Sequence, residues 1–288
     1  MLRKLLKYDL HAVARWWWIV AATLLGTSVL GAFLLRVTIS SAQGNSTIFG
    51  LWVMLCIFYF LLYFFLLSAA TIATTVLLWW RFYTHLYTDQ GYLTFTLPVK
   101  RRALLVSKII NEMVWYVAQF ALLAVCVLLF CLIAPPATAQ YPVINPIVFQ
   151  TVRTFFQGAV QLLGGGALAL FIIEFILFLL VSVLFSVCLV QFCITVGAVI
   201  AKKHKLLVGI GIYYAVNMGL SFVGQLLSNI VSAMMTGGLG ILMSNATQNQ
   251  MIAIFLLIFL LVIFVMLAGA ALFYCLMQDK VDRKLNLA

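Results

Sequence analysis

The stretch RFYTHLYTDQGYLTFTLPVKRRALLVSK, residues 81–108, is a long polar interruption between two strongly apolar blocks of the chain. Near its start, Tyr83, Leu86 and Tyr87 recur at i, i+3 and i+4, which predicts one apolar face on a short helix leaving a membrane. Such a face can lie in the groove of a partner protein. We therefore expect a structured segment that docks on a partner; a helix resting on lipid headgroups is the alternative.

Two stop signals follow this predicted helix. Gly91 ends an Asp-Gln-Gly turn and can take the positive φ that a helix end needs. Pro98 bars a helix from continuing through the Thr-Leu-Pro that precedes the basic cluster. A second helix is expected to begin near Lys100, so residues 81–108 would form a turn between two helices.

The composition identifies the chain as an integral membrane protein. Of its 288 residues, 66% are hydrophobic and only 8% are charged, which leaves too little polar surface for a soluble globule. The formal net charge of +11 is concentrated at the ends of apolar blocks. This pattern is typical of membrane orientation and does not indicate nucleic-acid binding. The six cysteines lie in or beside apolar blocks, without metal-ligand spacing, and are interpreted as packing residues.

The expected fold is a single all-α transmembrane domain over residues 1–288. An amphipathic interfacial helix (1–15) precedes the first span, which is expected to be retained and not cleaved as a signal peptide. The six predicted spans are 16–35, 51–80, 114–133, 166–200, 206–227 and 251–274. A loop of about thirty residues is expected after Pro135-Pro136. Residues 228–250 are too short to cross and contain Gly237, Gly238 and Gly240, which suggests a re-entrant or interfacial hairpin on the outer side.

The distribution of lysine and arginine predicts that both termini lie in the cytoplasm. With six crossings, fifteen of the seventeen basic residues fall on the cytoplasmic side: Arg3, Lys4, Lys7, Arg15, Arg81, Lys100, Arg101, Arg102, Lys108, Lys202, Lys203, Lys205, Lys280, Arg283 and Lys284. Arg36 and Arg153 fall outside. This bias follows the positive-inside rule, and adding or removing one span would destroy it.

The string LYTDQGYLTFTLPVKRRALLVSKII resembles the cytoplasmic segment after the second span in bacterial ABC exporter permeases of the type-two class. Those subunits often read Asp-Glu-Gly-Tyr-Leu, then Thr-Leu-Pro-Val and a Leu-Leu-x-Ser-Lys run. The matching positions are Asp89, Gly91, Tyr92, Leu93, Thr96, Leu97, Pro98, Val99, Leu104, Leu105, Ser107 and Lys108, and Gln90 replaces the usual acid. The match covers about a tenth of the chain and does not indicate which substrate is transported.

This resemblance implies a cytoplasmic ABC ATPase as partner and a second permease subunit, of the same or a homologous chain, in the lipid bilayer of a bacterial cytoplasmic membrane. The ATPase-coupling residues would be Tyr83, Leu86, Tyr87, Asp89, Gly91, Tyr92, Leu97 and Pro98. The chain has no P-loop sequence, so ATP and Mg²⁺ would bind the partner. No arrangement of catalytic residues appears either, and we do not expect an enzyme. Drugs, antimicrobial peptides, lipids or polysaccharides would be the substrates.

Glu174 is the one carboxylate inside a predicted span. A carboxylate at that depth usually faces a protein interior or a wet cavity, which suggests a place in the translocation pathway. The alternative is a structural residue near the outer interface, hydrogen-bonded to Gln161 or Gln225. Two other functions also stay open. One is a secondary carrier, which normally needs more intramembrane polar residues than this chain offers; the other is a non-transporting scaffold or sensor.

Overall fold

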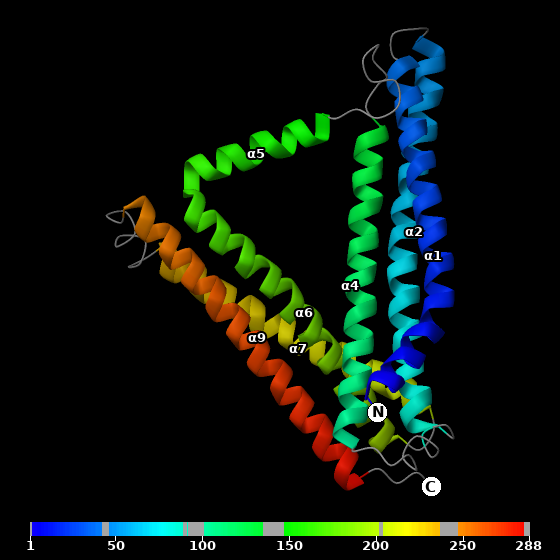
Figure 1. Ribbon diagram of the computed structural model, residues 1–288, viewed down its shortest axis with the longest axis vertical. Helices are drawn as coiled ribbons and strands as arrows, with labels where there is room; N and C mark the ends of the chain where they lie inside the picture. Colours follow the sequence, from blue (N-terminus) through cyan, green and yellow to red (C-terminus); the bar gives the residue numbers. More distant parts are fainter. Residues whose placement is uncertain are drawn as a thin grey trace. The chain divides into compact units, whose positions relative to one another are not determined.

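The computed structural model describes residues 2–41, 46–88, 91, 101–134, 147–201, 204–236 and 247–284. Within these residues the chain is all-helical, without strands (Figure 1). The helices are α1 (Leu2–Ser41), α2 (Ser46–Tyr87), α4 (Arg101–Ile133), α5 (Ile147–Leu163), α6 (Gly165–Ile200), α7 (Lys205–Thr236) and α9 (Gln248–Lys284). All except α5 are long and apolar enough to cross a membrane. The chain is therefore a multi-pass helical membrane protein, as its composition predicts.

Several helices are longer than their predicted spans. The expected interfacial helix 1–15 and first span form one unbroken helix, α1. Helix α4 begins at Arg101, close to the helix start expected near Lys100, and continues without a break into the span expected from 114. Helix α7 continues through Ser228 to Thr236, so the first part of the expected re-entrant segment is helical; residues 237–246 lie outside the described part. Backbone hydrogen bonds hold a helix together in water as in lipid, so helices extend beyond the apolar run that marks a span.

Helix α5 occupies residues 147–163 of the loop expected after Pro135-Pro136, and for these residues the prediction of a loop was wrong; residues 135–146 lie outside the described part. Its polar residues gather on one side, whereas Phe149, Val152 and Phe156 belong to the opposite, apolar side. These three side chains are exposed. An exposed apolar face on a short helix is typical of a helix that lies in the membrane interface. Helix α5 therefore has the residue pattern of an interfacial helix and lies between the third and fourth candidate spans in the sequence.

The chain forms two compact units, Met1–Leu78 with Ile110–Gly158, and Trp79–Ile109 with Ala159–Ala288. In the first unit α1, α2 and α4 pack along their lengths (Figure 1). Two buried clusters hold them: Ala21, Leu24, Leu122 and Cys126, and Val13, Leu78 and Trp115. Polar contacts add to this packing, including Ser28 Oγ to Tyr63 Oη at 2.8 Å and Trp17 Nε1 donating to Gln119 Oε1 at 3.1 Å.

The second unit is built on α6, which packs on α9 through phenylalanines spaced by seven residues. On α6 they are Phe171, Phe178, Phe185 and Phe192. Their ring centroids lie 5.2–6.1 Å from rings of α9, first Phe255 and Phe259, then Phe273. Residue numbers rise together along the seam, so the two helices run parallel. A seven-residue repeat places these side chains on one face of the helix. That face stays in contact with a neighbouring helix when the two helices supercoil slightly around each other.

The packing of α6 on α7 depends on two glycines. A Cβ on Gly197 would lie 2.5 Å from the Cα of Gly209 and 3.1 Å from the carbonyl oxygen of Lys205. A Cβ on Gly209 would lie 3.0 Å from the Cα of Ile194. Both obstacles are backbone atoms that cannot rotate away. The two helices therefore approach as closely as their backbones allow, which only glycine permits at these positions.

The membrane orientation is testable at two exposed, described residues. We expect Thr247→Cys to react with an impermeant thiol reagent added to intact cells, and His204→Cys to react only after permeabilisation, because His204 lies beside the lysine cluster that predicts the cytoplasmic side. Cys275 and Cys131 should first be replaced by serine, since the other four native cysteines are buried. Labelling of His204→Cys in intact cells would reverse the predicted topology.

Candidate functional site

The last turn of α2 is fixed against α6 by a short chain of hydrogen bonds. The hydroxyl groups of Tyr87 and Thr195 lie 2.7 Å apart, and Thr195 Oγ1 donates to the backbone carbonyl of Gln191 at 2.7 Å. Tyr87 is only 7% exposed and Leu86 is fully buried. Helix α2 thus ends in a specific, water-excluded contact inside the segment 81–108 that was predicted to bind a partner.

The apolar face expected on Tyr83, Leu86 and Tyr87 does not face outward in this structure. Leu86 and Tyr87 are turned into the second unit, and Tyr83 is half-buried with its ring 6.3 Å from that of Tyr87. These side chains therefore connect the segment to its own chain. A partner would have to contact other residues, and coupling to an ATPase stays a prediction. Asp89, Tyr92, Leu97 and Pro98 lie outside the described residues.

Gly91 closes the turn after α2 in an unexpected way. Its N–H donates to the carbonyl oxygen of Thr88 at 2.7 Å. The predicted positive φ is wrong, because among the described glycines only Gly164 has one. Instead, a Cβ on Gly91 would run into the carbonyl group of Leu86, with the carbonyl carbon at 2.7 Å. Glycine is required here because the chain folds back onto the end of its own helix.

Glu174 lies on α6 in the same row as the aromatic seam. It follows Phe171 by three residues and precedes Phe178 by four, so all three share a helix face. Its Oε2 atom is buried and has no hydrogen-bond partner within the described structure. The alternative pairing with Gln225 is not present, since Gln225 Nε2 donates to Asn229 Oδ1 at 3.4 Å, and no bond to Gln161 is present either. A buried carboxylate oxygen without a partner fits a group that meets a ligand or a second subunit.

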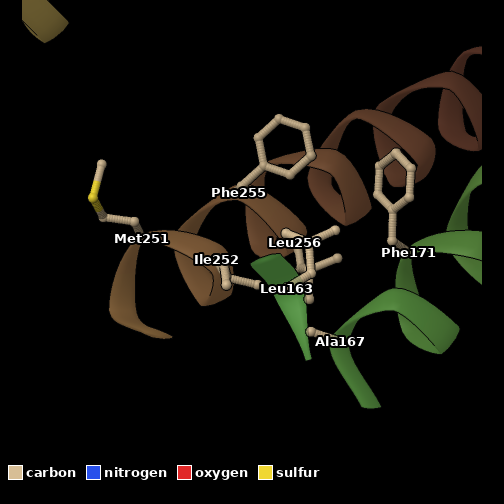
Figure 2. Close-up of a pocket in the computed structure, with 7 residues that line it drawn as sticks. All are labelled: Leu163, Ala167, Phe171, Met251, Ile252, Phe255 and Leu256. Carbon is tan, nitrogen blue, oxygen red and sulfur yellow. The ribbon is translucent and has the colours of Figure 1, made fainter. Parts of the chain in front are cut away.

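A wholly apolar pocket of about 380 Å³ lies one turn from Glu174. Figure 2 shows its lining side chains, which come from the last residue of α5 and the first turns of α6 and α9: Leu163, Ala167, Phe171, Met251, Ile252, Phe255 and Leu256. Phe171 belongs both to this pocket and to the seam that carries Glu174. Glu174 is not among the lining residues, so the pocket itself suits a wholly apolar group.

Two features were missed by reading the sequence. Every residue of α7 from Asn217 to Ile230 is exposed, and Asn217, Ser221, Gln225 and Ser228 share one face of it. Polar side chains within a membrane span usually face another protein or a water-filled cavity, and these are exposed in the single chain. They therefore indicate a contact with a second protein or with water. Their spacing of i, i+4, i+8 and i+11 was the available signal.

The second missed feature is Glu112, a carboxylate within the candidate span Arg102–Ile133 that is only 3% exposed. It was overlooked because that span was expected to begin at 114. The Glu112 side chain interacts with another group of the protein. Among the described residues, no three His, Cys, Asp or Glu side chains are grouped as metal ligands.

These sites were compared with known proteins. No family model, curated protein or solved structure matches the chain. The resemblance of residues 86–110 to exporter permeases therefore stays a prediction from the sequence, and the functional argument depends on the contacts described above.

Proposed function

We propose that this chain is the membrane-spanning subunit of an ATP-driven ABC exporter, paired with a second permease subunit and served by separate cytoplasmic ATPase subunits. The observation that carries the proposal is the Tyr87–Thr195 contact. It attaches the entrance of the resembling segment, residues 86–110, to α6, the helix that packs on both α7 and α9 in the second unit. A segment that transmits force from a partner needs such a fixed connection.

A coupling mechanism follows from this connection. Movement of the ATPase would displace the segment after Tyr87, and the hydrogen bond from Tyr87 to Thr195 would pass that displacement to α6. Helix α6 would then move Glu174, which lies 21 residues, or about 32 Å, from Thr195 along the helix axis. The close glycine contact with α7 and the aromatic seam with α9 would make the three helices move together.

The pathway lining proposed here combines three features of the second unit. Glu174 supplies a buried carboxylate oxygen, the apolar pocket beside Phe171 accepts hydrocarbon, and the polar face of α7 supplies amide and hydroxyl groups. Together they suit an amphipathic substrate, such as a drug, an antimicrobial peptide or a lipid-like molecule. The membrane would be the cytoplasmic membrane of a bacterium.

The proposal predicts that a P-loop ATPase is encoded next to this chain, and it is tested by assembly with that protein. We expect the two proteins to co-purify after co-expression and to hydrolyse ATP in nanodiscs faster than the ATPase alone. A Walker-A lysine variant of the ATPase should bind but not hydrolyse. Absence of binding, or of such a neighbouring ATPase, would overturn the assignment and favour a carrier or scaffold.

Coupling is tested at Tyr87. We expect Tyr87→Phe to leave ATPase binding unchanged and to lower transport per ATP about fivefold, because one hydrogen bond of about 1 kcal/mol is lost from the connection. Thr195 Oγ1 keeps its bond to the carbonyl of Gln191, so no buried group is left unpaired.

Two further variants interpret this result. Tyr214→Phe changes an exposed tyrosine of α7 and should have no effect. The double variant Tyr87→Phe with Thr195→Val should transport as much per ATP as the single variant Thr195→Val, since both substitutions remove the same contact. Full coupling in Tyr87→Phe would show that the signal passes elsewhere.

A further inference from the structure

A second pocket, distinct from the apolar one, lies at the other end of the second unit. Its volume is about 400 Å³. The lining residues come from the end of α2, the connection before α7 and the first turn of α7: Trp80, Tyr83, His204, Lys205, Leu206 and Leu207. Residues more than a hundred positions apart thus form one site. The proposed coupling and transport do not use it as a binding site.

The polar side of this pocket is electropositive. Lys205 and His204 contribute side chains that have no hydrogen-bond or ion-pair partner in the described part of the chain. Lys205, Leu206 and Leu207 also form the first turn of a 32-residue helix, whose first N–H groups have no acceptor within the helix. The N–H of Val208 donates to the carbonyl oxygen of His204 at 3.2 Å. The ammonium group of Lys205, the imidazole of His204 and the N-terminal end of α7 meet at this pocket, which favours an anion.

The other side of the pocket is aromatic and apolar. Trp80 is 56% exposed and Leu207 is 65% exposed, so the pocket continues onto a surface that suits hydrocarbon. Tryptophan and tyrosine at the end of a membrane span are typical of the headgroup level of a bilayer. His204 has φ 54°, a left-handed conformation that is uncommon outside glycine. His204 follows the end of α6 in the sequence and is one of the residues that line the pocket.

We propose that this pocket binds the phosphodiester headgroup of an anionic phospholipid, with Lys205 and the first turn of α7 contacting the phosphate and Trp80 and Leu207 contacting the lipid chains. A free phosphate would use the cationic side alone. The apolar side of the pocket favours the lipid, because a soluble phosphate has no hydrocarbon to cover Trp80 and Leu207. The site joins the ends of α2 and α7, so an occupied pocket would hold them together. This inference does not depend on the ABC assignment.

The test uses the purified full chain in nanodiscs of phosphatidylcholine with a small fraction of brominated lipid. Bromine quenches nearby tryptophan, and the part due to Trp80 is the difference between the chain and its Trp80→Phe variant. We expect brominated phosphatidylglycerol to quench Trp80 at lower mole fraction than brominated phosphatidylcholine. Lys205→Gln should weaken this preference about fivefold, because one basic residue near a headgroup contributes about 1 kcal/mol. His204→Gln combined with Lys205→Gln should weaken it further.

Matched controls make each outcome decisive. Lys280→Gln removes the same charge from α9 and should keep the full preference for phosphatidylglycerol. Equal quenching by the two lipids would overturn the proposal, because the pocket would then be only a generic lipid contact. Reversal of the quenching by millimolar inorganic phosphate would also overturn it and identify a soluble phosphate as the ligand.

Discussion

Gly197→Ala is expected to separate α6 from α7 and to lower the midpoint of thermal unfolding by about 5 to 10 °C. The added Cβ would lie 2.5 Å from the Cα of Gly209, and a backbone atom cannot move without shifting the whole helix. Overpacking of this kind costs about 1–3 kcal/mol, which corresponds to several degrees for a chain of this size. Thermal unfolding of the purified protein in nanodiscs measures the change.

Gly211→Ala provides the matched control for this variant. Gly211 lies on α7 two residues beyond Gly209, and a Cβ there meets nothing within 4 Å. Alanine should be neutral or slightly stabilising, because it favours the helix by about 0.5–1 kcal/mol over glycine. Equal midpoints for the two variants would contradict the close approach of the two backbones.

Glu174→Gln is expected to lower transport by the assembled complex more than tenfold without changing its thermal stability. The amide keeps the size and hydrogen-bonding capacity of the side chain and removes the carboxylate, which has a buried oxygen without a partner. A hydrogen bond to a charged group contributes about 1.5–3 kcal/mol, enough for a tenfold loss when it serves the substrate. Transport and substrate-stimulated ATP hydrolysis are the two measurements.

The control for Glu174 lies on the same helix. Ser182 Oγ donates to the carbonyl of Leu179 at 2.8 Å within α6, so Ser182→Ala should change neither transport nor stability. Unchanged transport in Glu174→Gln would identify Glu174 as a structural residue. A fall in stability together with transport would point the same way, because a pathway residue should affect transport alone.

The number and order of the spans follow from the sequence because apolar runs of about 20 residues are strongly constrained in a bilayer. The predicted span 166–200 differs from α6 by a single residue at its start. The aromatic seam was also present in the sequence, as phenylalanine at every seventh position. It was not recognised, since α6 is apolar on all sides and its pattern does not show which face meets a neighbour.

The burial of Tyr87 could not have been predicted in the same way. An apolar face at i, i+3 and i+4 looks identical whether it packs on a partner or on a distant helix of the same chain. The contact with Thr195 joins residues 108 positions apart, and no local pattern specifies such a partner. Helix α5 was missed for another reason: its glutamines, threonines and arginine resemble a polar loop until they are placed at helical spacing.

Gly164 joins α5 to α6 as a single residue with φ 81°, and backbone hydrogen bonds continue on both sides of it, from Gly164 N–H to Val160 and from Leu168 N–H to Gly164. The adjoining apolar pocket therefore lies at the very start of the candidate span Gly165–Ile200, which would place it at one face of the hydrocarbon layer. Molecules would then enter that pocket sideways from one leaflet. Their apparent affinity, calculated from the concentration in water, would depend on two quantities. One is the oil–water partition coefficient of the molecule, and the other is how well it packs against Phe171 and Phe255.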